Sequence, residues 1–384
     1  MSLFAFEDAA CLALAAAHPT PLFAYSRAMA SRQFQHLRGA LPARVQLAFA
    51  VKANPHPELL KLFAELGASF DCASGGELHR VGALPLASGQ VFYAGPGKRR
   101  EELALALALG ARVQVEGWED LLHLEALAEQ PVHVNLRVHP ATGAEERNRI
   151  IGGTGPSAFG VDEENVPALL ERAQLLTQVR IRGLHVFAAS NQRDAEALLS
   201  THRMVLELAR RLQQRHGLLL EQIDLGGGLG VPYAPEEAPL DVNALGQGLA
   251  SLLAAHAWFT GRLILEPGRF LAAPCGVYLA RVVRVKESRG TRFVILEGGI
   301  NHLLRPLLTG QPFPVKAVGK TGTTRPAILT GPLCTSLDRL GDVHLPELEP
   351  GDLVAFGMTG AYGFTEAMAP FLSHPAPAEI WVEE

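Results

Sequence analysis

The sequence has few of the features that mark secreted, metal-binding or membrane-spanning proteins. Its four cysteines are far apart and form no CxxC pair, so neither a zinc site nor a disulfide framework is predicted. Reduced thiols are the simplest interpretation, and they favour a cytoplasmic protein. The apolar run 11–17 follows Glu7 and Asp8 rather than basic residues, so it does not resemble a signal peptide. No apolar stretch reaches the ~20 residues that span a bilayer. The cysteines are Cys11, Cys72, Cys275 and Cys334.

The charge balance excludes further classes of partner. The 384 residues carry a formal net charge of -5, with a pI near 6.3, which gives no electrostatic footprint for nucleic acid. No basic run favours a membrane surface, and no GxxxxGK(S/T) segment indicates a nucleotide triphosphate. With 48% hydrophobic and 19% charged residues, the chain can build a large core over two domains.

From residue 45 the chain alternates short apolar strands with helices rich in alanine and leucine. Several strands are apolar nearly throughout, as expected for parallel strands covered on both faces. Eight such strands with crossover helices predict an α/β fold, a (β/α)8 TIM-type barrel. An open doubly wound sheet is the alternative. The predicted strands are 45–51, 69–73, 91–94, 112–116, 132–138, 181–187, 222–225 and 262–265.

After residue 270 the helical periodicity disappears, and strands with period-two alternation follow one another between turn residues. This change predicts a second, all-β domain. We expect the barrel to cover residues 27–262 and a β-sandwich or β-barrel domain to cover residues 263–384, joined by the N-terminal segment 1–26. The strands predicted for this domain are 276–285, 291–296, 314–318, 325–330, 352–356 and 379–382.

Lys52 stands at the end of the first predicted barrel strand. Lysine is rarely buried without a partner, because burial disfavours the charged ammonium. An amine that is partly neutral is a nucleophile for carbonyl carbon, which is Schiff-base chemistry. Taken alone, this segment favours a lysine that caps the strand and reaches water. The choice between this lysine and a Schiff-base lysine depends on the other strand-end residues.

Polar or ionisable residues fall at nearly every predicted strand end, where a barrel places its active site. The glycine run Gly226-Gly227-Gly228 follows the seventh strand, a common phosphate position in barrels. Glu266 follows the eighth strand and could keep a ring nitrogen protonated. A lysine, a phosphate site and such a carboxylate are together what pyridoxal phosphate needs. The other strand-end residues are Asp71, Ser74, Tyr93, Glu116, Arg137, Phe187 and Ser190.

Six motifs between residues 49 and 363 resemble, in order, those of the ornithine/diaminopimelate decarboxylase family, the fold-type III pyridoxal-phosphate enzymes. The resemblance implies the alanine racemase-like architecture of the group IV decarboxylases, a barrel with a C-terminal all-β domain. It also implies a head-to-tail homodimer with active sites at the interface. The motifs are Phe49–Asn54, Phe70–Glu77, Asp224–Gly228, Glu266–Arg269, Gly331–Cys334 and Gly360–Gly363.

The resemblance implies a role for each matched residue. Lys52 would carry pyridoxal 5'-phosphate as an imine, and Glu266 would pair with the ring nitrogen. Cys334 would reach in from the partner subunit and supply a proton after carbon dioxide leaves, a step that suits a thiol; without its motif it would be a buried small hydrophobe. No metal ligand is expected. The other cofactor-binding residues would be Asp71, Glu77, Arg137, Phe187, Ser190, Gly226, Gly227, Gly228, Gly268, Arg269 and Tyr362.

Three departures from the family pattern bear on the substrate. Phe187 replaces the stacking histidine and offers no proton; His185 shares its strand face and either lines the site or packs in the barrel. Thr335 replaces the acid that binds a distal ammonium, although Asp338 is near in sequence. Arg305 could clamp a carboxylate, as in diaminopimelate enzymes, but the tyrosine that follows there is absent. The predicted substrate-binding residues are Arg305, Thr335, Asp338 and Tyr362.

These departures look more like the subgroup that acts on modified or carrier-bound amino acids. We expect a cytoplasmic lyase that removes the α-carboxylate of an amino acid bearing a distal acyl or carboxyl group. Diaminopimelate decarboxylase is the first alternative. A non-catalytic cofactor-binding homologue is the second, and the presence of Lys52 and Cys334 argues against it. A racemase would need a second acid-base group that we do not identify. The segment 141–160, rich in glycine and charge, is the candidate lid.

Overall fold

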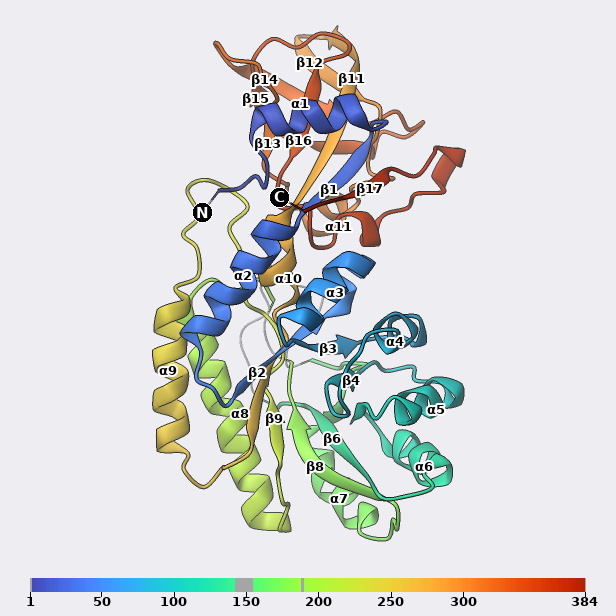
Figure 1. Cartoon of the computed structure of the whole chain (residues 1–384), viewed down its shortest axis with the longest axis vertical. Helices are drawn as coiled ribbons and strands as arrows, with labels where there is room; N and C mark the ends of the chain where they lie inside the picture. The colour runs from blue at the N-terminus through green and yellow to red at the C-terminus, as the bar shows by residue number, and fades with distance from the viewer. Residues whose placement is uncertain (1, 142–154, 188–189, 384) are drawn as a thin grey trace. The chain divides into compact units, whose positions relative to one another are not determined.

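The structure is a computed structural model that describes residues 2–141, 155–187 and 190–383 (Figure 1). It divides into two compact units. The first comprises residues 34–231 and 240–269, and the second comprises residues up to Gln33, 232–239 and 270 onward. Thirteen residues of the candidate lid, 142–154, lie outside the described part of the chain.

Eight parallel strands close into a barrel in the first unit. They are β2 (Val45–Ala50), β3 (Ser69–Cys72), β4 (Val91–Tyr93), β5 (Arg112–Val115), β6 (Val132–His139), β8 (Val179–His185), β9 (Gln222–Asp224) and β10 (Arg262–Leu265). Around the ring they follow the order β5-β4-β3-β2-β10-β9-β8-β6. Pairing of Gln114 in β5 with Asn135 in β6 closes the ring. The predicted barrel is therefore confirmed, and the open sheet is excluded because it would leave two unpaired edges.

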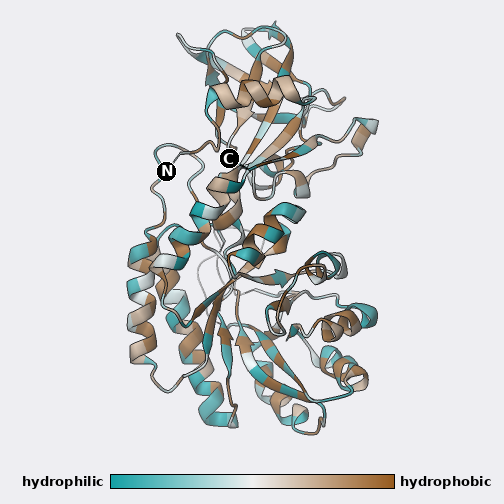
Figure 2. Ribbon diagram, viewed as in Figure 1, coloured by the Kyte–Doolittle hydropathy of each residue, from teal (hydrophilic) through white to brown (hydrophobic). Residues whose placement is uncertain are grey.

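Helices alternate with the strands along the chain and lie around the outside of the ring (Figure 1), and both polar and apolar residues lie along them (Figure 2). The strand alternation explains this packing: Phe49 of β2 points outward, and its ring lies 4.5 Å from that of Phe63. The short strand β7 (Val161–Asp162) pairs with β6. The helices are α2 (Arg27–Ala40), α3 (Pro57–Glu65), α4 (Gly75–Gly82), α5 (Arg100–Ala108), α6 (Trp118–Leu127), α7 (Val166–Ala173), α8 (Ala195–His216), α9 (Val242–Ala255) and α10 (Gly268–Ala272).

The second unit is mainly sheet, as predicted. Its strands are β1 (Leu22–Ser26), β11 (Gly276–Ser288), β12 (Thr291–Leu296), β13 (Val315–Ala317), β14 (Arg325–Thr330), β15 (Arg339–Leu345), β16 (Leu353–Phe356) and β17 (Ala378–Val382). The main path is β13-β16-β11-β12-β14-β15, and β1 pairs with β11 and β17. Side chains of helix α1 (Asp8–Ala17) join the core of this sheet through Cys11 and Ala15. Strand β15 escaped prediction because Gly341 and Asp342 interrupt its apolar alternation.

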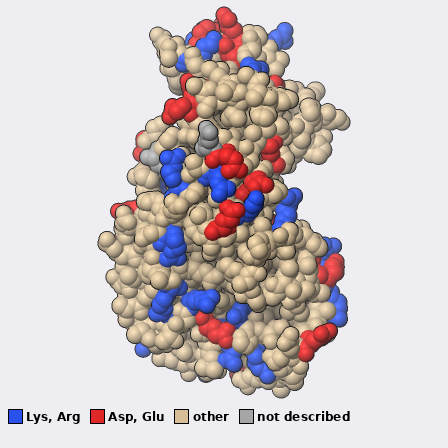
Figure 3. Space-filling view, in the orientation of Figure 1, with Lys and Arg blue, Asp and Glu red and all other residues tan. Residues whose placement is uncertain are grey.

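Two surface properties agree with the sequence. Acidic and basic side chains are interspersed on the face shown in Figure 3, as the small net charge predicts. None of the described helices combines the length and the apolarity needed to cross a bilayer.

Candidate active site

The carboxyl ends of the barrel strands hold most of the residues that the sequence singled out. Lys52 lies in the 3-10 turn 51–53 directly after β2, and its Nζ lies 3.5 Å from Oδ2 of Asp71 in β3. The same Nζ lies 5.7 Å from the centre of the Phe187 ring, just beyond β8. The lysine side chain is one-third exposed, whereas Asp71 is buried. The amine therefore stands between a carboxylate and an aromatic face, and it remains accessible to a ligand.

Glu266 and Asp224 form a carboxyl pair at the ends of β10 and β9. Each offers a carboxylate oxygen within 4.8 Å of the other, and Asp224 accepts hydrogen bonds from Gln114 Nε2 (2.9 Å) and from the N–H of Gly226 (2.9 Å). Burial raises the pKa of both carboxyl groups above the ordinary range, and the Asp71 charge adds to the effect. A pair of this kind retains a proton at neutral pH unless a cation takes its place.

His185, at the end of β8, lies inside the barrel next to this pair. Its Nε2 is 3.6 Å from Oε1 of Glu266. Burial lowers the pKa of the imidazole well below its usual value, and the charge of Arg137 lowers it further, so the ring is neutral and the contact is not an ion pair. The ring is buried inside the barrel and lies next to Glu266, so both roles that the sequence left open for His185 stay predictions.

The glycine run after β9 is packed too closely for side chains. Gly226 has φ +70°, and a Cβ there would lie 2.8 Å from the carbonyl oxygen of Val186; a Cβ on Gly227 would lie 2.7 Å from that of Glu266. The carbonyl of Gly228 accepts the N–H of Gln192 (2.8 Å), which ties the glycine run to the loop that carries Ser190. The backbone of the run thus faces the strand ends directly, as a phosphate-binding loop requires.

Gly268 and Arg269 lie at the start of α10, and Pro267 separates them from Glu266. The N–H of Gly268 donates to the carbonyl of Glu266 (2.9 Å), and a Cβ there would lie 2.9 Å from Cβ of Ala50. Gly268 therefore lies where a side chain would not fit, and its predicted role beside the phosphate stays a prediction. Arg269 is buried.

Glu77 lies in the first turn of α4, where Ser74 caps the helix by accepting its N–H (3.2 Å). The Glu77 carboxyl accepts the N–H of Ala73 at 2.6 Å. Burial raises its pKa to about 7, and the nearby charge of Lys52 opposes the rise. The charges of Asp71 and Lys52 are therefore close enough to Glu77 to influence its pKa.

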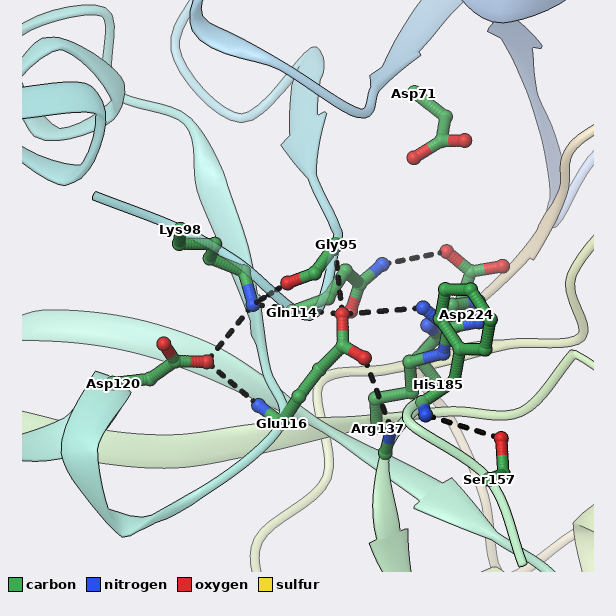
Figure 4. Close-up of polar contacts among 12 residues, drawn as sticks. Asp71, Gly95, Lys98, Gln114, Glu116, Asp120, Arg137, Ser157, His185 and Asp224 are labelled. Carbon is green, nitrogen blue, oxygen red and sulfur yellow. Dashed lines mark hydrogen bonds and ion pairs between the residues drawn. The ribbon is translucent and has the colours of Figure 1, made fainter.

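A second polar cluster lies at the ends of β4, β5 and β6, and the sequence indicated only part of it (Figure 4). Arg137 Nη1 donates to Oε1 of Glu116 at 3.1 Å. The buried Lys98 contacts Glu116 Oε1 at 3.5 Å and Asp120 Oδ2 at 2.8 Å. The Glu116 carboxylate also accepts the N–H groups of Gly95 (2.6 Å) and Gly160 (2.9 Å). Glu116 therefore contacts Arg137 and two neighbouring loops, the one that carries Gly95 and Lys98 and the one that carries Gly160.

Sequence reasoning missed several members of these clusters. Lys98 and Asp120 lie in loop and helix positions with no strand-end signal, and Gln114 lies inside a strand. Asp224 had a usable signal, because it lies two residues before the glycine run, at the end of the strand that the run follows.

The second unit carries the remaining predicted residues in two groups. In the first group, Arg305 Nη1 contacts both oxygens of Glu366 (3.1 and 2.9 Å), and its guanidinium lies 4.8 Å from the centre of the Tyr362 ring. Arg305 lies in the short helix α11 (Arg305–Thr309), which the sequence did not indicate, and it is buried.

The second group lies in the loop between β14 and β15. Cys334 is exposed there and Thr335 is half-buried. Asp338 is buried, and its two oxygens accept the N–H groups of Ile300 (2.8 Å) and Leu333 (2.7 Å). Both carboxylate oxygens already accept a backbone N–H, so a substrate ammonium would have to share them, and the predicted substrate-binding role of Asp338 stays a prediction.

A closed parallel barrel that gathers a lysine, a buried carboxyl pair and a glycine run at its strand ends defines the class of pyridoxal-phosphate barrel enzymes. Comparison with known proteins gives the family. Residues 27–273 match the family model described as pyridoxal-dependent decarboxylase, pyridoxal binding domain. The chain belongs to this family of pyridoxal-phosphate-dependent decarboxylases, which are lyases.

Individual relatives match over nearly the whole chain. The L-glutamyl-(BtrI acyl-carrier protein) decarboxylase of Niallia circulans is 31% identical, over 97% of this chain and 91% of that protein. The diaminopimelate decarboxylase of Methanothermobacter thermautotrophicus is also 31% identical, over 97% and 88%. The crystal structure of Helicobacter pylori diaminopimelate decarboxylase complexed with L-lysine has a TM-score of 0.89 and 28% identity, covering 97% of this chain and 94% of that one.

The residues at the barrel strand ends fit the cofactor that the family uses. Among the buried polar atoms of the described residues that have no hydrogen-bond partner, Asp71 Oδ1, both His185 nitrogens and Glu266 Oε1 lie at the barrel strand ends. Buried polar atoms are normally satisfied, so their orphan state marks a place for polar ring substituents. His185, Asp224 and Glu266 also each place a polar side-chain atom within 4.8 Å of the others, and burial raises the pKa of both carboxyl groups.

Proposed function

We propose that the chain removes the α-carboxylate of an amino acid that also bears a distal acyl or carboxyl group. Lys52 would attach the cofactor covalently, and Glu266, supported by Asp224, would hold the ring nitrogen. Gly227 and Gly228, with Ser190 and Arg269, would hold the phosphate. When bound, the cofactor supplies an electron sink for the bond to the departing carboxylate.

The other residues would orient the reactants and handle protons. Phe187 would cover one face of the ring without offering a proton. Asp71, Glu77 and Arg137 would surround the imine and the ring oxygen, and Tyr362 would close over the phosphate. Cys334, from a partner subunit in a homodimer with shared active sites, would protonate the carbon that loses its carboxylate. A non-catalytic role is disfavoured, because Lys52 and Cys334 are both present.

One observation carries the choice of substrate, namely the ion pair between Arg305 and Glu366. A free distal carboxylate would have to compete with a carboxylate that the chain already places on this guanidinium. Thr335 provides no charge for a distal ammonium. A neutral acyl end, such as an amide or a thioester, meets neither obstacle. The similarity to a decarboxylase named for a carrier-bound glutamyl group supports the same choice.

The test is carbon dioxide release across a matched panel: glutamate, a side-chain amide of glutamate, glutamyl-carrier protein and diaminopimelate. We expect the acylated substrates to have the highest kcat/KM. Glu366→Gln should free Arg305 and raise kcat/KM for glutamate relative to its amide by about tenfold. Glu349→Gln, an exposed acid of the same unit, is the control. Fastest turnover of diaminopimelate would overturn the proposal.

Diaminopimelate decarboxylase is the second candidate, favoured by the presence of Arg305 and by the relative of that name. Complementation of a lysine auxotroph that lacks this enzyme decides between the two. Growth without lysine would establish the second candidate, and we expect none.

A further inference from the structure

We propose that Asp338 is a positioning residue that holds Cys334 in place. Its carboxylate connects two loops of the second unit: Oδ1 accepts the N–H of Ile300, and Oδ2 accepts that of Leu333, the residue before Cys334. Ile300 lies in the loop after β12 and Leu333 in the loop after β14. A single buried side chain thus ties the cysteine loop to its neighbour.

The two loops are shaped around this carboxylate. A Cβ on Gly299 or on Gly331 would collide with the Asp338 oxygens, and a Cβ on Gly331 would also collide with Gly299 Cα. The backbones therefore approach so closely that side chains are excluded on both sides of the acid. Such packing leaves the carboxylate no alternative position, which is what a rigid support requires.

Hydrogen bonds fix the loop on both sides of the cysteine. Before it, Leu333 is held by Asp338. After it, the N–H of Thr335 donates to the carbonyl of Leu333 (2.8 Å), and the N–H of Asp338 donates to the carbonyl of Thr335 (3.2 Å). Cys334 is exposed at the middle of this turn, whereas Cys11, Cys72 and Cys275 are buried. The backbone that carries this thiol is therefore fixed by the hydrogen bond between Leu333 and Asp338.

A proton donor must lie within hydrogen-bond reach of its acceptor, and a displacement of about 1 Å can cost up to about 100-fold in rate. Asp338 therefore influences the reaction through Cys334 without touching the substrate. This catalytic consequence rests on the proposed function of Cys334, but the structural effect on the loop does not.

Thiol alkylation measures the structural effect directly. The cofactor-loaded protein is treated with iodoacetamide, and intact mass spectrometry follows modification of the exposed cysteine; Cys334→Ser identifies the site. We expect Asp338→Asn and Asp338→Ala to change the alkylation rate of Cys334 by several-fold, because the loop loses one or both of its anchors. Asp342→Asn, an exposed acid on β15, should leave the rate unchanged. An unchanged rate in folded Asp338 variants overturns the proposal.

Steady-state kinetics measure the catalytic effect. The Asp338 variants should lower kcat by about tenfold or more, while KM and the cofactor affinity change less than about twofold. If the alkylation rate changes while kcat stays normal, Asp338 supports the loop but Cys334 takes no part in the reaction. This outcome distinguishes the positioning role of Asp338 from the proposed catalytic role of Cys334. If neither variant folds, hydrogen exchange of the unmodified protein decides: the N–H of Leu333 should exchange far more slowly than that of Leu337, which bonds only the Thr335 hydroxyl. Equal rates would contradict the proposal.

Discussion

Lys98 and Glu116 lie 3.5 Å apart, Nζ to Oε1, with side chains that are only 1% and 5% exposed. Lys98 comes from the loop after β4, and Glu116 comes directly after β5. The same carboxylate holds Arg137, so the lysine balances a charge that positions an arginine of the candidate site. A buried charge cluster of this kind depends on each of its members.

Removal of the lysine should therefore be costly. Lys98→Met removes the cation that the buried Glu116 side chain and the half-buried Asp120 share; Glu116 keeps Arg137, so we expect a loss of about 1–3 kcal/mol in the free energy of unfolding. Cofactor affinity should fall as well, because Glu116, the partner of Arg137, loses one of the contacts that hold it in place. Urea denaturation and cofactor titration measure the two effects. Lys61→Met, on the exposed face of α3, should change neither; a Lys98 variant as stable as the parent would show that the cluster is not coupled.

Lys52→Ala should abolish covalent attachment of the cofactor. Borohydride reduction followed by peptide mass spectrometry should find the cofactor on the peptide containing Lys52 in the parent protein and on no peptide in the variant. The imine absorbance and the turnover should disappear together. Lys61→Ala, which removes an exposed lysine, should retain all three signals. An imine spectrum that survives Lys52→Ala would refute the assignment.

The buried carboxyl groups should make the cofactor-free protein less stable as the pH rises from 6.5 to 8. Burial raises the pKa of Asp224 and of Glu77 to about 7, whereas the unfolded carboxyls are already ionised in this range. The native state therefore binds more protons than the unfolded state, and stability falls as these protons leave. The lowered pKa values of His185 and His202 act in the opposite direction, but only below about pH 6.5.

Thermal unfolding at several pH values measures this dependence. Glu77→Gln should flatten the slope between pH 6.5 and 8 while leaving the sign of the effect at lower pH unchanged. Glu65→Gln, an acid at the end of α3, should leave the slope as it is. A stability that rises across this range would mean that the carboxyl groups are ionised in the folded state.

Hybrid dimers test whether Cys334 serves the active site of a partner subunit. Lys52→Ala and Cys334→Ala homodimers should each be nearly inactive. Mixing them under conditions of subunit exchange should restore about a quarter of the parent activity, because half of the dimers then hold one complete site. Mixtures that stay inactive although the subunits exchange would place both residues in one chain's own site. Native mass spectrometry verifies the exchange.

The barrel was predictable from the sequence because its strands are short apolar runs separated by helices. Parallel strands are normally covered on both faces, so their residues are apolar nearly throughout. The first-strand lysine, the glycine run and Glu266 were predictable for a related reason: their places in the strand order bring them to one end of the ring. Strand β15 and helix α11 were not, since turn residues interrupt one and the other is only five residues long.

The sequence by itself determined the fold class, the family and the residues that stand at the strand ends, because periodicity and motif order are local properties of the chain. Only the tertiary structure decided which charges share a site. Glu366 lies 61 residues from Arg305, and Asp338 bonds Ile300 across 38 residues. No local pattern records such pairings; they exist because folding buries both groups in the same place, where a charge without a partner is costly.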